Sequence, residues 1–367
     1  MIGIIRKEGQ NAHLSCFSGT FWILSVKKQT TIGPPTAKRV TVHVIVPGRL
    51  HLGFIDMHGG MGRNFGSLGL CLADINTHIS AAISESVFIQ GPSSQRASVY
   101  AGRMLEHLEI NTGVEIKILD AIPEHAGLGS GTQLSLAVGT AIANAYELNV
   151  PVEEIAEIMQ RGMRSGIGIG AFTLGGFLVD GGRGKETGIP PIICHLPFPE
   201  AWRFVLVFDS ERQGIHGIGE KLAFEKLQPM SERITEYLCR LTLIQALPAL
   251  VEADCEQFGA TISEIQIRVG DHFAPLQGGR YCSQAVAQVL SCMLDLGATG
   301  VGQSSWGPTG FALFANETQA YQALRQNRDK WLYETRLSFR LCKARNHGAE
   351  VRLEDAEAGK SFKLQKI

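Results

Sequence analysis

The pattern of hydrophobic and polar positions changes at Val40. From there the two kinds alternate through "VTVHVIVPG", the period-two pattern of a half-buried strand, which Pro47-Gly48 is expected to end. Residues 1–39 lack such a pattern and finish in the breaker stretch "TTIGPPTAKR". We therefore expect residues 1–39 to be a poorly ordered N-terminal extension and the folded region to start at residue 40.

Beyond this first strand, predicted strands and helices are interleaved. Strands are predicted at 67–84 (one or two), 114–120, 175–182, 203–209, 310–315 and 336–342. Helices are predicted at 94–110, 132–148, 152–162, 218–227, 232–247 and 280–294, with Pro248 expected to stop the fifth. The order has no steady strand-helix-strand rhythm, so it favours an α+β fold over a doubly wound parallel sheet.

Length and composition narrow the organisation further. A chain of 367 residues suggests two domains, and the proline-rich stretch 190–199 is the expected boundary, giving domains at 40–195 and 196–367. Lys plus Arg (34) balances Asp plus Glu (35), so no overall charge attracts nucleic acid or a membrane, and any anion must be held locally. The eight cysteines show neither CxxC nor zinc spacing, as expected for buried thiols in a reducing, cytoplasmic compartment.

A glycine-rich loop, "PEHAGLGSGTQLSLAVG" (residues 123–139), leads directly into a predicted helix. The first N–H groups of a helix lack partners and carry partial positive charge, so such a loop can bind an anion. No lysine completes a P-loop, and Gly127, Gly129 and Gly131 are spaced GxGxG, unlike a Rossmann fingerprint. By itself the loop is consistent with either a phosphate site or a structural turn.

Two further segments favour the phosphate site. "PGRLHLGFIDMHG" (47–59) follows the first strand, and "GVGQSSWGPTGFALF" (300–314) is a second Gly/Ser-rich loop. In this order, the three segments resemble the signature motifs of the GHMP kinase superfamily, over about residues 40–345. The resemblance implies a ribosomal-S5-like N-terminal domain and a ferredoxin-like C-terminal domain, with the central loop around the phosphates of the ligand.

The chain departs from the kinases of that superfamily at two places. Their central motif usually continues Gly-Leu-Gly-Ser-Ser-Ala, whereas this chain has Gly131-Thr132-Gln133 after Ser130. Many of them also carry an aspartate that orients or deprotonates the acceptor hydroxyl, and Gly168 stands at the matching position. Both departures argue against ATP as the ligand.

Together with "RSGIGIGAFTLGGFLVDGG", "GIHGIGE" and "QGGRY", the motifs resemble one branch of the superfamily, the β-ribofuranosylaminobenzene 5′-phosphate synthases. This resemblance implies an enzyme of tetrahydromethanopterin biosynthesis that joins 4-aminobenzoate, or a close analogue, to phosphoribosyl diphosphate and releases CO2 and diphosphate. An ATP-dependent small-molecule kinase is the alternative, and a non-catalytic phosphometabolite-binding protein is a third reading. No nucleic-acid or membrane partner is expected, and a homodimer is an ordinary expectation.

The resemblance also implies roles for particular residues. The diphosphate is expected on the loop residues Gly127, Leu128, Gly129, Ser130, Gly131 and Thr132. Candidate catalytic residues are Arg49, His51, Asp56 and Arg164, with Arg212 a further candidate for a phosphate or the aryl carboxylate. Candidate substrate-binding residues are His216, Ser304, Ser305 and Gly307. Mg²⁺ is expected with the diphosphate, and Asp56, Asp180 and Asp209 are unranked ligand candidates.

Several of these residues also have plain structural readings. A lone loop histidine such as His51 or His216 is more often structural or solvated than catalytic, and Arg164 can cap a helix. Trp306 can be packing between domains, and Asp180 before Gly181-Gly182 is ordinary turn chemistry. Glu124 is equally consistent with a site residue and a solvated turn residue.

Overall fold

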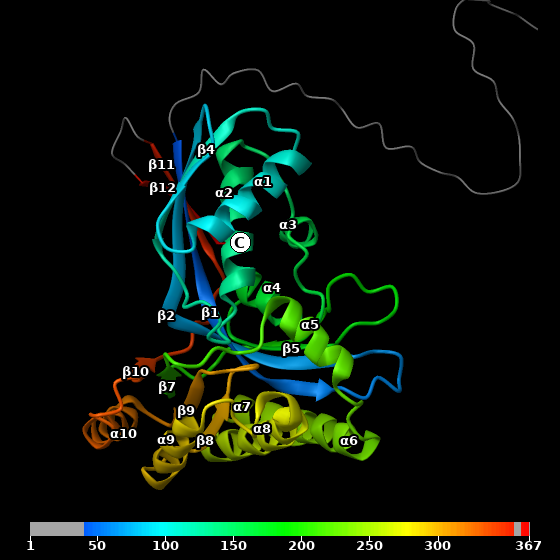
Figure 1. Ribbon diagram of the computed structural model, residues 1–367, viewed down its shortest axis with the longest axis vertical. Coiled ribbons are helices and arrows are strands. Elements are labelled where there is room, and N and C mark those ends of the chain that lie inside the picture. Colours follow the sequence, from blue (N-terminus) through cyan, green and yellow to red (C-terminus); the bar gives the residue numbers. More distant parts are fainter. Residues whose placement is uncertain (1–39, 356–360, 367) are drawn as a thin grey trace, which may run out of the picture. The chain divides into compact units, whose positions relative to one another are not determined.

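The computed structural model describes residues 40–355 and 361–366, so the predicted extension 1–39 lies outside the described part. Within that part, two β-sheets are covered by helices (Figure 1). The larger sheet contains β1 (Val40–Asp56), β2 (Phe65–Ser84), β3 (Phe88–Gln90), β4 (Gly113–Asp120), β5 (Phe177–Asp180), β6 (Ile192–Leu196), β11 (Glu350–Asp355) and β12 (Ser361–Lys366). The smaller sheet contains β7 (Arg203–Asp209), β8 (Gly300–Gln303), β9 (Gly310–Phe314) and β10 (Leu337–Cys342).

The helices of the first half are α1 (Ser94–His107), α2 (Ser130–Ala145), α3 (Val152–Ile158) and α4 (Ile167–Thr173). Those of the second half are α5 (Gly217–Lys226), α6 (Glu232–Leu241), α7 (Leu247–Val251), α8 (Cys255–Gln277), α9 (Gln284–Asp295) and α10 (Glu317–Lys330). The larger sheet has the order β12-β11-β1-β2-β4-β3, with β5 on β2 and β6 on β5, and the smaller has the order β10-β7-β9-β8. All pairings are antiparallel except β3 with β4, which confirms the predicted α+β class.

The strand β1 passes through two hydrophobic cores. Val42 and Val44, two positions apart and therefore on one face, pack with α1 and α2 in the first core. Leu52 and Phe54 lie in a second core with residues of α6, α7, α8 and β7. The sequence predicted a strand that ends at Pro47-Gly48, and this was wrong, because β1 continues to Asp56. Its pairing with β2 is irregular at Pro47/Arg49 and His51/Gly53, and between these points Arg49 reaches the glycine loop, where it donates to the Gly127 carbonyl.

Pro248 does not stop the helix that precedes it. α6 runs into a π-helical segment (Thr242–Ala246) and then into α7, in whose first turn Pro248 lies. Proline cannot donate a backbone hydrogen bond, and the locally widened π turn lets the helix continue across it. The stretch Glu232–Val251 is long and apolar enough to span a membrane by composition alone. Its inner side, including Leu238 and Leu250, packs in the second core, so this composition is weak evidence for a membrane span.

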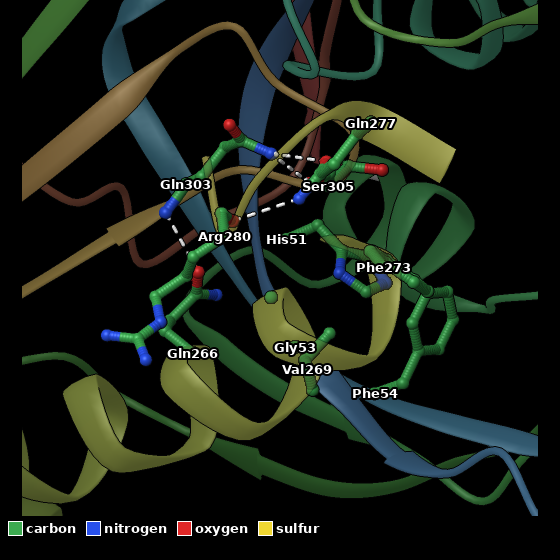
Figure 2. Close-up of a pocket in the computed structure, with 11 residues that line it drawn as sticks. His51, Gly53, Phe54, Gln266, Val269, Phe273, Gln277, Arg280, Gln303 and Ser305 are labelled. Carbon is green, nitrogen blue, oxygen red and sulfur yellow. Dashed lines mark hydrogen bonds between the residues drawn. The ribbon is translucent and has the colours of Figure 1, made fainter. Parts of the chain in front are cut away.

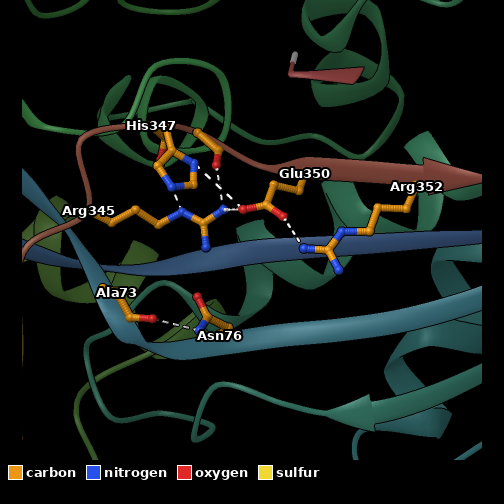
Figure 3. Close-up of polar contacts among 7 residues, drawn as sticks. Ala73, Asn76, Arg345, His347, Glu350 and Arg352 are labelled. Atoms are coloured by element: carbon orange, nitrogen blue, oxygen red, sulfur yellow. Dashed lines mark hydrogen bonds and ion pairs between the residues drawn. The ribbon is translucent and has the colours of Figure 1, made fainter. Parts of the chain in front are cut away.

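The chain finally returns from the smaller sheet to the larger one. β11 pairs with β1, although the sequence assigned these residues to the second domain. Figure 3 shows the ion pairs that fix this return: Glu350 lies 3.0 Å from Arg345 and 2.7 Å from Arg352. Burial would raise the pKa of Glu350, but the two guanidinium groups hold it below its ordinary value. The Arg345 carbonyl accepts from Gly176 N, which ties the returning segment to the start of β5.

Candidate active site

The three glycine-containing motifs meet at the carbonyl group of Gly127. Ser304 Oγ donates to this oxygen at 2.7 Å, and Arg49 Nη1 donates to it as well. The backbone N–H of Arg49 donates to Leu128 O at 3.1 Å. The segments 47–59 and 300–314, which are far apart in the sequence, therefore meet at the central loop, as their resemblance to one family's motifs implied.

Ser304 holds this junction together from inside the protein. It is fully buried, and its Oγ accepts from the backbone N–H of His51 at 3.0 Å while donating to Gly127. Gly127 has φ +77°, and a Cβ there would lie 2.2 Å from the Ser304 carbonyl oxygen, so only glycine fits. Ser304 was expected to bind substrate, but it lies beneath the cleft, whereas Ser305 and Gly307 line it.

A cleft of about 340 Å³ opens at the N-terminus of α2. Gly129 is the N-cap residue with φ +83°, and the first turn of α2 contains no acidic residue. Of the six predicted loop residues, five line the cleft, while Leu128 is buried in the second core. The full lining is Arg49, Arg96, His125, Gly127, Gly129, Ser130, Gly131, Thr132, Arg161, Gly214, Ile215, His216, Gly217, Glu220, Ser305, Trp306 and Gly307.

Two arginines that the sequence did not single out, Arg96 of α1 and Arg161 just after α3, line this cleft. Arg161 Nη2 donates to Tyr100 Oη, and its Cζ lies 5.3 Å from the centre of the Tyr100 ring. Arg96 Nη1 lies 3.0 Å from Glu124 Oε1, which makes Glu124 a partner of the site. A helical pattern shows that such arginines lie near the surface, but not that they face a distant loop, so no sequence signal identified them.

Arg49 supplies a third guanidinium group. Burial lowers the pKa of Arg49 to about 10, although the negative charge of Glu220 raises it in part. Arg49 therefore remains a cation at neutral pH. Its Nε has no hydrogen-bond partner within the described part of the chain. A buried N–H without a partner is costly, so this donor is suited to an anionic ligand.

His216, a predicted substrate-binding residue, lines the cleft as half of a stacked pair. Its ring lies 3.5 Å from that of His125, centre to centre, with 21° between the planes. Gly214 joins the pair, because its N–H donates to His125 O and its carbonyl lies 2.8 Å from His216 Nδ1. The pKa of His125 is lowered by burial and by the neighbouring His216 and Arg96. A histidine pair, of which His125 has a lowered pKa, therefore borders the phosphate loop.

Arg164 and Arg212 do not line the cleft. Arg164 forms an ion pair with Glu220 at 2.8 Å and lies over the Phe224 ring at 4.8 Å, so it holds Glu220 in place at the edge of the cleft. Arg212 is exposed on the loop before α5. The predicted ligand contacts of both arginines stay predictions, and in this structure their side chains lie outside the lining of the cleft.

The three aspartates considered as magnesium ligands also lie outside the lining, and each has partners. Asp56 accepts from two backbone N–H groups of its own turn, and Asp209 accepts from Ser283 Oγ at 2.6 Å. Asp180 is fully buried and accepts from Ser67, Ser165 and two backbone N–H groups. These bonds oppose the burial that raises the pKa of Asp180. In the described residues, no group of three or more His, Cys, Asp or Glu residues could hold a metal ion.

His51 faces a separate, water-sized cavity of about 10 Å³ rather than the cleft. Figure 2 shows its ring beside Phe54 and Phe273, with Ser305 nearby. His51 is 3% exposed, and burial, together with Arg49, lowers its pKa to about 3. This surrounding favours the structural reading of His51 over a catalytic one.

The two departures from the kinase motifs contact each other. A Cβ at Gly168 would lie only 2.9 Å from Cγ2 of Thr132, so Thr132 fills the space that a larger residue at 168 requires. Gln133 Nε2 donates to the Gly168 carbonyl at 2.7 Å and fixes the start of α4. The position where many GHMP kinases have an aspartate is therefore closed by the altered end of the glycine loop.

Comparison with known proteins assigns the class. Residues 97–176 match the family model "GHMP kinases N terminal domain", and residues 246–332 match "GHMP kinases C terminal". Among solved structures, L. major mevalonate kinase superposes with a TM-score of 0.65 at 15% identity, covering 86% of this chain and 100% of that one. The chain thus has the two-sheet GHMP kinase fold.

Closer relatives narrow the assignment. The β-ribofuranosylphenol 5′-phosphate synthase of Archaeoglobus fulgidus is 36% identical over 83% of this chain and 97% of its own length. The enzyme of that name from Methanocaldococcus jannaschii is 35% identical over 60% of this chain and 75% of its own. The chain belongs to the family of these synthases within the GHMP superfamily, and it is an enzyme of that type.

Proposed function

We propose that the enzyme joins an aryl acid to phosphoribosyl diphosphate in the cleft at the N-terminus of α2, with release of CO2 and diphosphate. The charge of the cleft carries this proposal. Three guanidinium groups and a helix N-terminus face a space in which Glu220 is the only carboxylate among the described lining residues. Such a site suits a substrate that bears both a diphosphate and a monophosphate.

The reaction balances without a protein base. The bond between ribose C1 and the diphosphate oxygen breaks, and the ring carbon that bears the carboxylate attacks C1. The bond to the carboxylate then breaks, its electron pair restores the aromatic ring, and CO2 leaves without transfer of a proton. The protein has to position two substrates and stabilise the departing diphosphate, which fits a site with glycine at position 168.

The aryl acid is best accommodated beside Trp306 and Ile215, the large apolar side chains of the lining. Trp306 stacks on Phe273 at 4.0 Å and is therefore held rigidly. A ribofuranosylphenol product arises from 4-hydroxybenzoate, and an aminobenzene product arises from 4-aminobenzoate. The names of the relatives favour 4-hydroxybenzoate as the substrate, whereas the resemblance of the sequence motifs implied 4-aminobenzoate.

Mg²⁺ is proposed as part of the diphosphate substrate. The ion keeps waters and phosphate oxygens and needs one or two protein carboxylates at most, and Glu220 is the lining residue that can serve. The free cysteines of the described residues fit the proposed reducing cytoplasm.

The test incubates purified protein with phosphoribosyl diphosphate, Mg²⁺ and either aryl acid labelled in its carboxyl group. Release of labelled CO2 with diphosphate in equal amounts is expected for at least one acid. Arg49→Gln should raise the KM for one substrate, whereas Arg212→Gln, outside the lining, is the matched control and should not. No CO2 with either acid, together with ADP formation from ATP and a hydroxylated metabolite, would instead make the protein a kinase.

A further inference from the structure

We propose that Gly131 determines what this cleft binds: without a side chain there, Arg96 and Arg161 reach the N-terminus of α2 and clamp a diphosphate group. The inference rests on the proposed function, since it assigns the subsite of that substrate's leaving group. It also gives a role to the first residue at which the glycine loop departs from the kinase motif.

The geometry around Gly131 is selective. A Cβ at this position would lie 2.8 Å from Arg96 Nη2 and 3.7 Å from both terminal nitrogens of Arg161. Gly131 has no left-handed φ, so its backbone conformation does not require glycine. The requirement is space, and two guanidinium groups occupy that space directly over the first turn of α2.

Both arginines are oriented before any ligand arrives. Arg161 is held by the buried Tyr100, through its hydroxyl and across its ring. Glu124 pairs with Arg96 and accepts a hydrogen bond from Ser93. Burial alone would lower the pKa of Arg96, but Tyr100 and Glu124 raise it. Side chains fixed in this way lose little freedom when an anion binds.

The charges converge on one place. The first-turn N–H groups of α2 have no intrahelical acceptors, and the cations of Arg96 and Arg161 border the same residue, Gly131. Guanidinium groups this close repel one another unless an anion lies between them. A diphosphate has enough oxygens to accept from two guanidinium forks and the helix N-terminus together.

The decisive variant is Gly131→Ala, with Arg96→Gln as its direct counterpart. Alanine should leave the melting temperature equal or higher, because it favours a helix and its closest contact is a terminal nitrogen of Arg96, which can shift only by giving up its place in the clamp. Calorimetry with inorganic diphosphate and Mg²⁺ should show a Kd raised roughly tenfold to a hundredfold in both variants, as expected for loss of a charge-assisted hydrogen bond. The control is Gly102→Ala, an exposed position in α1 with open space around it, and its Kd should equal that of the wild type.

The KM for phosphoribosyl diphosphate should rise in parallel, with the KM for the aryl acid unchanged. A Kd for diphosphate that is unchanged in Gly131→Ala and in Arg96→Gln would overturn the clamp, even if the wild type makes product. A wild type that forms no product but binds diphosphate in a way that depends on Gly131 and Arg96 would refute the proposed function and leave the clamp standing.

Discussion

Gly168→Ala should destabilise the protein when Thr132 is present, and it should be neutral or stabilising when Thr132 is replaced by serine. The alanine Cβ would lie 2.9 Å from Thr132 Cγ2, a distance that forces one of the two to move. Thr132→Ser removes that methyl group and keeps the hydroxyl. The remaining contacts, 3.4 Å to Cβ and 3.6 Å to Oγ1, are close to ordinary van der Waals distances.

The magnitude follows from two opposing terms. Overfilling a packed site costs about 1–3 kcal/mol, while replacing glycine by alanine in a helix gains up to about 1 kcal/mol. Gly168→Ala alone should therefore lower the free energy of unfolding by roughly 0–3 kcal/mol. In the Thr132→Ser background the first term is absent, so the same change should be neutral or stabilising, by up to about 1 kcal/mol.

Urea unfolding of the four proteins, wild type, both single variants and the double variant, measures the coupling directly. A coupling energy of about 1–3 kcal/mol is expected. If the two changes add within about 0.5 kcal/mol, the residues do not compete for one space, and the explanation given for glycine at position 168 fails.

Three further predictions follow from the same region. Ser304→Ala leaves the buried His51 N–H without an acceptor and should lower the free energy of unfolding by about 1–3 kcal/mol in urea titrations; a loss below about 0.5 kcal/mol would mean that its hydroxyl does not hold the loops together. Because His51 has a pKa of about 3 when folded and 6.5 as a free group, the unfolded chain takes up the proton first. Stability should then fall by about 2 kcal/mol from pH 7 to pH 5 on account of this residue, and an equally steep pH profile in His51→Asn would refute it. Gly129→Val should lose both melting temperature and diphosphate affinity, since φ is +83° and Arg49 Cγ lies 3.3 Å from the added Cβ; lost affinity with an unchanged melting temperature would contradict this.

The parts of the fold that follow local patterns could be predicted from the sequence. The strand predicted at 203–209 is β7, and the glycine loop enters α2 as expected. The long helix α8 could not be recognised, because Gly259 and Gly270 weaken its helical pattern. Both glycines serve packing: a Cβ at Gly259 would lie 2.5 Å from Thr299, and one at Gly270 would lie 2.8 Å from Arg280. Tertiary contacts therefore stabilise α8 where the local helix propensity of its sequence is weak.

The candidate site likewise contains residues that the sequence motifs identified and residues that they did not. Motif order correctly predicted that Arg49, Ser305 and the loop glycines would come together, because each is marked by unusual glycine spacing. Arg96 and Arg161 have no such glycine pattern beside them. The sequence pattern around an arginine in or next to a helix is the same whether the side chain faces solvent or a ligand. The position of Arg96 and Arg161 at the cleft is visible only once α1 and the segment after α3 pack beside the loop.

Gly131, Thr132 and Gln133, which look like three independent substitutions in a kinase loop, act as parts of one arrangement. Gly131 admits guanidinium groups, whereas Thr132 and Gln133 close off and fix position 168, where a kinase would carry its carboxylate. A carboxylate there would add negative charge beside the phosphate loop and help a hydroxyl to attack. In the proposed reaction the nucleophile is a ring carbon that loses CO2, so no hydroxyl has to be activated, and cations that hold the departing diphosphate stabilise the charge that develops on it. The proposed chemistry therefore predicts a GHMP fold that lacks the aspartate at position 168 and has arginines beside its glycine loop. Replacing Gly131, Thr132 or Gln133 alone by the kinase residue should not produce a kinase.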